Sequence, residues 1–326
     1  MKLKEIGEFG LIERIREIFG KGEGVLAGLG EDVAVIEAGE GCLLLTADLL
    51  TEGVHFRSHL ISPFQLGWKA LVVNLSDIAA CGGIPRYFLV SLMVEPEREW
   101  ESVREIYEGI KAAGDRYGAT LVGGDTSRGE ALTLSIALLG EGIRDEVILR
   151  KGARPGDRIY VSGTLGDAAL GLRLLLQGKK KGYLIERHLS PTPRLTLGRE
   201  LARRHLATAA IDISDGLVQD LSHILEESRV GAKLHLEKVP ISDECREEAE
   251  ALGLDPLRLA LSGGEDYELL FTVAPGDESQ LEEVAGLCGV PITRVGEVTS
   301  ERKLRLFKDG KGISLEISGY DHLKGS

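Results

Sequence analysis

The sequence has few of the features that mark secreted, membrane-spanning or nucleic-acid-binding proteins. Its four cysteines are widely spaced and form no CxxC pair, so we expect reduced thiols instead of a disulfide framework or a zinc site. No apolar run is long enough to cross a bilayer, and the N-terminus lacks a signal-peptide core. A net charge of -13 argues against the basic surface that binds nucleic acid. We therefore expect a cytoplasmic protein with no membrane or nucleic-acid partner.

Asparagine is almost absent. Asn74 is the only asparagine in 326 residues, and it is accompanied by four Gln and two Met, a balance similar to thermophile usage. Asn74 and Asp77 lie three residues apart in a long helix predicted to begin at Ser62-Pro63, so they share one face. A polar pair on the inner face of an apolar helix is costly unless it is hydrogen-bonded or binds a metal. We therefore expect the pair to have a function.

Several common catalytic and nucleotide-binding motifs are also missing. There is no GxxxxGK[ST] P-loop, no HRD followed by DFG, and no GxSxG nucleophile elbow. The weak dinucleotide fingerprint Gly22-x-Gly24-x-x-Ala27 follows a predicted helix instead of a strand, so its required context fails. These absences exclude P-loop enzymes, protein kinases and the commonest serine hydrolases.

The sequence does contain carboxylates that follow apolar runs of strand length. Such places are Asp48 after 43–45, Asp125 after 121–124, and Asp212 and Asp215 after 209–211. We expect the runs to be buried strands and the acids to lie at the mouth of a sheet, where open α/β sheets bind ligands. One isolated Asp would be interpreted as a turn cap, but the repetition favours hard oxygen ligands for magnesium and phosphate.

Further acids extend this set and indicate its chemistry. They are Glu31, Asp32, Asp77, Glu265 and Asp266. Scattered carboxylates fit metal-dependent phosphoryl transfer, in which the protein positions charged groups and metal ions neutralise the developing charge.

Helix and strand patterns divide the chain into two parts. Strand, helix, strand and strand patterns follow one another from residue 86 to residue 140, which predicts an α/β domain. The segment 150–157 is rich in charge, Gly and Pro, so we place a boundary there. We expect an α/β domain at 1–149 and an α+β domain at 150–326.

A series of motifs resembles those of the thiamine-monophosphate kinase family, in the same order and over nearly the whole chain. The segments Asp-Ile-Ser-Asp-Gly and Gly-Gly-Glu-Asp-Tyr-Glu-Leu together make the resemblance highly specific. The motifs are GLGED at 28–32, TAD at 46–48, EGVHF at 52–56, NLSD at 74–77, GGD at 123–125, RKGARPGD at 150–157, DISDG at 212–216, SGGEDYEL at 262–269 and GYDH at 319–322.

The resemblance implies a two-domain aminoimidazole-ribonucleotide synthetase-like fold, with an N-terminal domain that forms a homodimer through its sheet. It implies the reaction of ATP with thiamine monophosphate to give ADP and thiamine diphosphate, with several magnesium ions. The implied metal ligands are Glu31, Thr46, Asp48, Asp77, Asp125, Asp212 and Asp215, of which Asp48, Asp77 and Asp212 are the catalytic acids. The implied ATP contacts are Tyr107, Gly124, Arg150 and Ser214, and the implied thiamine-phosphate contacts are His55, Glu265 and Tyr320.

Two positions depart from the family pattern. The chain has Glu31 where the family usually has Asp, and Ala47 where it usually has Thr. The flanking glycines let Glu31 retreat and still reach a metal, but the neighbouring Asp32 is an alternative ligand. The acceptor is a phosphate oxygen, already anionic near neutral pH, so no general base is needed. His55 is then either a binding residue or a hydrogen-bonded loop histidine.

Two other functions remain open at this point. A sister enzyme, such as aminoimidazole-ribonucleotide synthetase or selenophosphate synthetase, would use similar acids on another acceptor. The latter would need a Cys or equivalent near the N-terminus, and none precedes Cys42. A non-catalytic nucleotide-binding regulator is disfavoured because the acids outnumber what binding alone requires.

Overall fold

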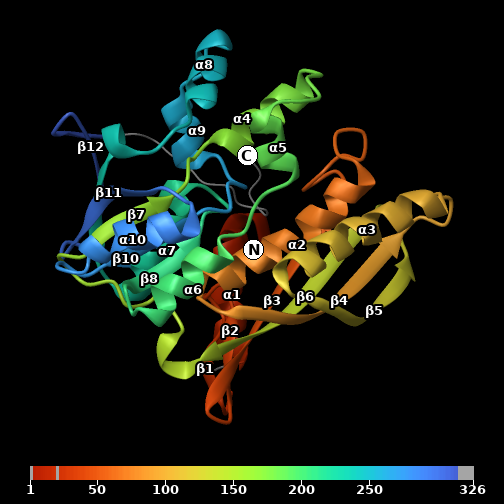
Figure 1. The fold of residues 1–326 in the computed structure, drawn as a ribbon, viewed down its shortest axis with the longest axis horizontal. Helices are drawn as coiled ribbons and strands as arrows, with labels where there is room; N and C mark the ends of the chain where they lie inside the picture. The colour runs from red at the N-terminus through yellow and green to blue at the C-terminus, as the bar shows by residue number, and fades with distance from the viewer. Residues whose placement is uncertain (1–2, 20–21, 315–326) are drawn as a thin grey trace.

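The computed structural model describes residues 3–19 and 22–314, so the expected substrate contact Tyr320 lies outside the described residues. The described chain forms two mixed sheets with helices packed around and between them (Figure 1). One sheet comes from the first half of the chain and the other from the second. The expected boundary between residues 149 and 150 falls between the last strand of one sheet and the first strand of the other.

Helices α2 and α3 lie across one face of the first sheet (Figure 1). The opposite face, which we call the open face, makes no comparable contact with a helix of the described residues. In sheet order the strands are β1 (Val25–Ala27), β2 (Ala34–Ala38), β3 (Gly41–Thr51), β6 (Thr133–Ile143), β4 (Ile84–Val94) and β5 (Thr120–Arg128). The helices of this half are α1 (Leu3–Phe19), α2 (Pro63–Ala80) and α3 (Trp100–Tyr117).

The second sheet is built from shorter strands, and more helices surround it. In sheet order these strands are β13 (Lys311–Ile313), β12 (Leu304–Lys308), β9 (Gly231–His235), β11 (Ile292–Thr299), β7 (Arg158–Ser162), β10 (Leu269–Val273) and β8 (Ala207–Asp212). The helices are α4 (Asp167–Leu176), α5 (Tyr183–Leu189), α6 (Leu195–Arg203), α7 (Leu217–Ser228), α8 (Asp243–Ala251), α9 (Pro256–Ser262) and α10 (Ser279–Cys288), with short 3₁₀ turns at Arg144–Glu146 and Leu236–Lys238.

The expectation of acids at the ends of buried strands is wrong for the first sheet. Among the described strands only β4 with β5 and β9 with β12 pair in parallel, so this is not an open parallel sheet. Asp48 lies inside β3, opposite Ile136, and Asp125 lies inside β5. Only Asp212 ends its strand. The error came from taking 43–45 as a continuous buried run.

Strand β3 is in fact half-exposed. Leu44 is buried, whereas Leu45 is 36% exposed and Leu49 is 49% exposed. Because side chains alternate along a strand, Leu44 shares the helix-covered face with Thr46 and Asp48, and Ala47 lies on the open face with Leu45. The departure at Ala47 is therefore on the side of the sheet away from Asp48.

Helix α2 begins where the sequence predicts. The Ser62 hydroxyl accepts a hydrogen bond from the Gln65 amide at 3.2 Å, and the Gln65 side chain accepts one from the Ser62 amide at 3.3 Å, which completes a capping box. The helix contacts β3, α3 and α6, so it packs against elements of both halves of the chain.

Glycines bring α2 into backbone contact with its neighbours. A Cβ at Gly67 of α2 would lie 1.9 Å from the Ile106 carbonyl oxygen of α3, and one at Gly109 of α3 would lie 1.9 Å from that of Phe64. On the other side, a Cβ at Gly198 of α6 would lie 1.8 Å from the Ala79 carbonyl oxygen. Any side chain at these positions would force the helices apart.

No helix in the described part of the chain is long and apolar enough to span a membrane.

The glycine contact predicts a stability effect. We expect Gly67→Ala to lower the free energy of unfolding by about 1–3 kcal/mol or more, because the methyl group meets rigid backbone. The matched control is Gly286→Ala in α10, where a Cβ would have no heavy atom within 4 Å, and it should stabilise by up to about 1 kcal/mol. Urea unfolding followed by circular dichroism measures both. Equal stability of Gly67→Ala and the wild type would contradict the close helix contact.

Candidate active site

Three carboxylates from distant parts of the chain meet between the two sheets. Asp32 comes from the turn before β2, Asp77 from the last turns of α2, and Asp212 from the end of β8. An oxygen atom of each lies within 4.8 Å of an oxygen atom of the others. Asp32 and Asp212 are buried and Asp77 is partly buried. We call these three residues, with the nearby Asp48, the acid cluster.

Neutral side chains hold the acid cluster in place. Thr46 on β3 donates a hydrogen bond to Asp77, and the Ser76 hydroxyl donates one to Asp212 at 2.6 Å. Asn74 accepts a hydrogen bond from the Asp48 amide at 3.1 Å and donates one to a carbonyl oxygen of its own helix at 3.1 Å. The one asparagine of the chain therefore fixes β3 to α2 beside the acids.

The carboxylates of the acid cluster are shielded from solvent, and they repel one another. Burial raises the pKa of Asp77 well above its usual range, and the charges of Asp48, Asp212 and Asp32 raise it further. Burial and the charge of Asp32 raise the pKa of Asp48 to about 6 and that of Asp212 to about 8. Such a group is stable in its charged form only when a cation compensates it.

Arg150 supplies part of that compensation. Its Nε donates to Asp32 at 3.0 Å and its Nη1 donates to the Gly30 carbonyl oxygen at 3.1 Å. The Arg150 backbone amide donates to Glu31 at 2.7 Å, so the Glu31 carboxylate turns toward the start of the second domain. Of the two adjacent acids, Asp32 joins the cluster and Glu31 does not.

One atom of the cluster has the property expected of a metal ligand. The Asp32 Oδ2 atom is buried and has no hydrogen-bond partner within the described residues. A buried carboxylate oxygen is normally satisfied, so this atom fits a bound cation. Carboxylate and hydroxyl oxygens are hard ligands, which magnesium prefers. The residues present therefore fit a magnesium site.

Asp215 belongs to a second polar group. A carboxylate oxygen of Asp215 lies within 4.8 Å of ligand atoms of Asp220 and His223 on α7. Asp220 also accepts hydrogen bonds from the Asp215 amide at 3.1 Å and the Gly216 amide at 3.0 Å, so it stabilises the turn into the helix. Burial lowers the pKa of His223 to about 4, with a further contribution from Arg150.

The two most specific motifs lie side by side. The Glu265 amide donates to the Ser214 carbonyl oxygen at 2.8 Å, and the Tyr267 amide donates to that of Ile213 at 2.9 Å. A Cβ at Gly264 would lie 2.1 Å from the Ser214 carbonyl oxygen, so glycine is required at this approach. The motifs thus form one paired loop next to Asp212.

Within the second of these motifs, the acids have different roles. Asp266 is fully buried and accepts the Gly166 amide at 2.7 Å and the Ala168 amide at 3.1 Å, which caps α4. Glu268 is fully buried too and pairs with Arg187 at 2.8 Å and with Arg194. Both are structural. Glu265 alone of the three keeps an exposed side chain, at 28%.

Four further predicted site residues belong to none of the groups described above. Tyr107 packs against the hydrophobic core from α3. Gly124 pairs with Val90, and its Cβ would lie 1.9 Å from the Val90 carbonyl oxygen. Asp125 is exposed on the edge strand β5. His55 Nδ1 accepts the Thr51 amide at 3.0 Å, which fixes the loop after β3.

Sequence reasoning missed several residues that complete the site. Ser76 is hidden within the apolar helix, and Asp220 and His223 look like ordinary polar positions of a surface helix. Lys69 did carry a usable signal, because a lysine in the middle of an apolar helical run requires a buried counter-charge. That counter-charge is Glu265, whose Oε1 lies 2.6 Å from the Lys69 Nζ.

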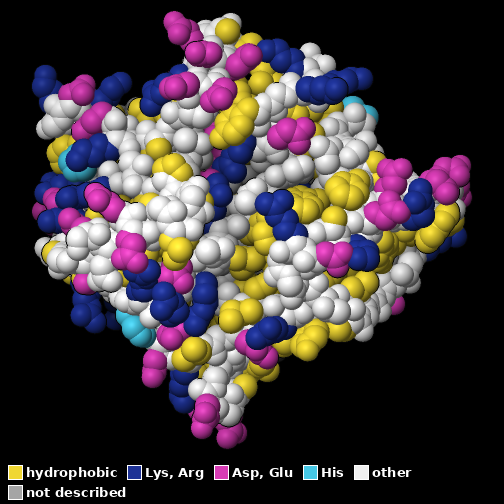
Figure 2. All heavy atoms as spheres, viewed as in Figure 1, with side chains coloured by type: hydrophobic (Ala, Val, Ile, Leu, Met, Phe, Trp, Pro, Cys, Tyr) yellow, Lys and Arg dark blue, Asp and Glu magenta, His cyan; other side chains and the backbone are white. Residues whose placement is uncertain are grey.

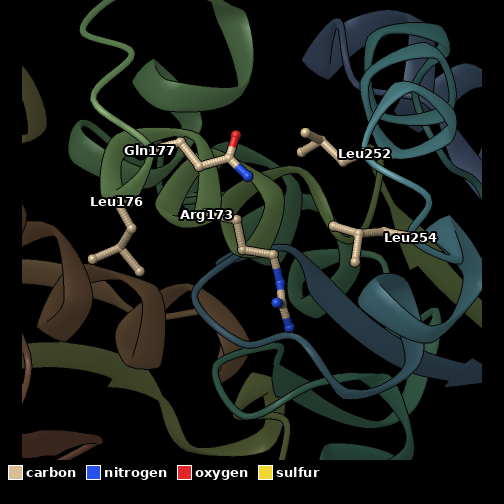
Figure 3. Close-up of a pocket in the computed structure, with 5 residues that line it drawn as sticks. All are labelled: Arg173, Leu176, Gln177, Leu252 and Leu254. Atoms are coloured by element: carbon tan, nitrogen blue, oxygen red, sulfur yellow. The ribbon is translucent and has the colours of Figure 1, made fainter.

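A surface cavity of about 260 Å³ lies apart from the acid cluster and shares none of its residues. Arg173 and Leu176 belong to α4 and Gln177 directly follows it, whereas Leu252 and Leu254 belong to the segment that follows α8 (Figure 3). Its lining is mostly aliphatic and contains no acid. The chemistry of the cluster, and not the presence of this cavity, identifies the candidate active site.

The chain matches two family models over most of its length. Residues 30–142 match the AIR synthase related protein, N-terminal domain, and residues 154–309 match the corresponding C-terminal domain. The expected two-domain fold of this superfamily is therefore confirmed. Hydrogenase maturation protein HypE in complex with ATP, which is 20% identical with a TM-score of 0.72 over 89% of each chain, is similar in fold alone.

The relatives with higher sequence identity are thiamine-monophosphate kinases. The thiamine-monophosphate kinase of Aquifex aeolicus is 43% identical and covers 99% of this chain and 100% of its own. That of Escherichia coli is 39% identical, covering 97% of this chain and 98% of its own. A solved structure of AaThiL complexed with AMPPCP and TMP superposes with a TM-score of 0.87 at 39% identity, covering 99% of both chains.

The raised pKa of Asp212 predicts how stability depends on pH without metal. The folded protein keeps a proton on Asp212 up to about pH 8, whereas the unfolded chain releases it near pH 4, so stability falls as pH rises through this window. In a chelator, Asp212→Asn should therefore be more stable than the wild type at pH 8, by on the order of 1–4 kcal/mol, and similar at pH 4. Thermal unfolding across this pH range measures the difference. Asp115→Asn, at an exposed acid on α3, should leave the pH slope unchanged.

Proposed function

The chain belongs to the thiamine-monophosphate kinase family, and we propose that it transfers the terminal phosphoryl group of ATP directly to the phosphate of thiamine monophosphate. The products are ADP and thiamine diphosphate. The observation that carries the proposal is the Asp32, Asp77 and Asp212 group, with its unpartnered Asp32 oxygen, next to the paired loop of the two most specific motifs. The sequence relatives at 39–43% identity, which match over nearly their whole length, support the same activity.

We assign the magnesium ligands to the acid cluster, with Thr46 beside it. Asp32, Asp77 and Asp212 would hold one ion, and Asp48 and Asp215 extend the ligand set. When bound there, magnesium would supply positive charge that reduces the repulsion between the two anionic substrates.

The remaining roles go to residues around the cluster. Arg150 and Ser214 are proposed contacts of the nucleotide phosphates, because both lie next to the acids. Glu265 and His55 are proposed contacts of thiamine monophosphate. No side chain is needed to remove a proton, since the attacking phosphate oxygen is already anionic, so the protein acts by orienting the two substrates in line. The location we propose is the cytoplasm, and the four free cysteines support it.

One assay tests the activity. Purified protein with ATP, magnesium and thiamine monophosphate should produce thiamine diphosphate, and exhaustive chelation should abolish turnover. ADP formation that does not depend on added thiamine monophosphate would favour a sister enzyme with another acceptor. Binding of ATP with no turnover of any kind would favour a nucleotide-binding regulator.

The structure also makes the choice between Glu31 and Asp32 testable. We expect Asp32→Asn to raise the magnesium concentration for half-maximal rate by roughly tenfold or more, because it removes a charged ligand. Glu31→Gln should shift it only slightly, since the Glu31 carboxylate accepts the Arg150 amide outside the cluster. A magnesium titration of both variants decides the matter. A large shift in Glu31→Gln with none in Asp32→Asn would reverse the assignment.

We propose further that two copies pair through the open face of the first sheet. This face carries exposed apolar side chains on β3 and β4, the two strands on either side of β6. They are Leu45, Leu49, Tyr87 at 49%, Leu89 at 45% and Met93 at 38%. A soluble monomer rarely exposes such a continuous apolar patch. Figure 2 shows the other side of this half, where hydrophobic side chains over α2 and α3 are flanked by charged ones.

The dimer predicts the effect of a charge on that face. The wild type should show a dimeric mass by light scattering, and Leu89→Glu should shift it toward a monomer, because a partner would bury the carboxylate. Leu176→Glu on α4, where the leucine is 53% exposed, is the matched control and should stay dimeric. A monomeric wild type at working concentration would contradict the proposal.

A further inference from the structure

Lys69 is a charged residue where the fold requires none. It lies on α2 in an apolar segment, and only 1% of its surface is exposed. Burying an ammonium group costs several kcal/mol unless an opposite charge compensates it, and an apolar side chain of similar size would often be more stable. Its ion-pair partner is Glu265, whose Oε1 lies 2.6 Å from the Lys69 Nζ. The lysine is therefore unexplained by packing and is directed at one carboxylate.

His188 approaches the same carboxylate from another element. It lies on α5, is 6% exposed, and its Nδ1 is 3.1 Å from Glu265 Oε2. Burial lowers the pKa of His188, and the neighbouring Lys69 lowers it further. Lys69 and His188 thus approach different oxygens of Glu265 from two sides, the lysine as an ion pair and the histidine as a close contact without hydrogen-bond geometry.

The backbone of Glu265 is constrained as well. Its φ of +69° is left-handed, which is uncommon for a residue with a side chain, and its amide is bonded to the Ser214 carbonyl oxygen at 2.8 Å. Non-glycine residues in this conformation persist where their surroundings fix them, often at ligand sites. Of the three side chains, Glu265 is the most exposed, so it is the one that a ligand can reach.

Tyr267 lies close enough to both Glu265 and the acid cluster to be affected by their charges. It is 7% exposed and also left-handed, with a φ of +51°. Burial raises its pKa well above the usual range, and so do the charges of Glu265, Asp48 and Asp212. The ring therefore has Glu265 in its surroundings together with the acids proposed to bind magnesium.

We infer that Lys69 and His188 are positioning residues, which act on thiamine monophosphate only through Glu265 by holding its carboxylate in the orientation that the substrate meets. This inference rests on the proposed function. It assigns neither residue a contact with ATP or with magnesium. Loss of either should therefore weaken binding of one substrate and leave the transfer step largely unchanged.

The test is steady-state kinetics with each substrate varied in turn. Lys69→Met, which keeps the length of the side chain, should raise the KM for thiamine monophosphate roughly tenfold or more, with kcat and the KM for ATP within about threefold of the wild type. His188→Leu should act in the same direction, and His188→Gln, which retains a donor, should recover much of the loss. Lys111→Met, at an exposed lysine on α3, is the matched control and should change nothing.

A double substitution tests whether the residues act through Glu265. In a Glu265→Gln background, Lys69→Met should raise the KM for thiamine monophosphate no further, because its target has lost its charge. Additive effects would overturn the inference, and so would an unchanged KM in folded Lys69→Met. If Lys69→Met does not fold, equal KM values in His188→Leu and the wild type would overturn it. A wild type that neither binds nor converts thiamine monophosphate would overturn the proposed function itself.

Discussion

The backbone contact of α2 with α3 on one side and α6 on the other determines where every charged group of the site lies. Glycines at the two crossings allow this contact, and without it the helix could not be packed against both halves. One helix therefore carries Lys69, Asn74, Ser76 and Asp77 to fixed positions. The acids of β3 and β8 and the Glu265 loop then meet those positions from either side.

The buried and half-buried carboxylates of this molecule are compensated in two different ways. Glu265, Asp266 and Glu268 each have protein partners: a lysine and a histidine, two backbone amides, and two arginines. In the acid cluster, by contrast, Arg150 is the one cation paired with the acids in the described structure, and it is bonded to Asp32. The first arrangement is complete in the protein alone. The second leaves negative charge that the proposed magnesium ions would compensate, as a phosphoryl-transfer site requires.

Local patterns predicted much of this structure, and the limits of prediction were physical. The capping residues of α2 and the position of Asp77 on its inner face follow from helical periodicity. The rarity of asparagine marked Asn74 as functional, but not its bond with the Asp48 amide. The orientation of adjacent residues did not follow. Glu31 and Asp32 are adjacent carboxylates in one glycine turn, and they bond to different groups of Arg150, which is more than a hundred positions away. Likewise, the apolar run before Asp48 could not reveal which of its faces a helix would cover.

The position of α2 also decides whether the two halves can exist apart. Its end, at Ala79 and Ala80, belongs to a hydrophobic cluster with Leu197, Leu201 and Phe271 of the second half, while Leu184 and Leu189 join the cluster of the first. A gene split at the boundary between the sheets would leave each fragment with part of its core open to water. The sequence thus indicates two modules, but the shared clusters lead us to expect that they unfold as one cooperative unit.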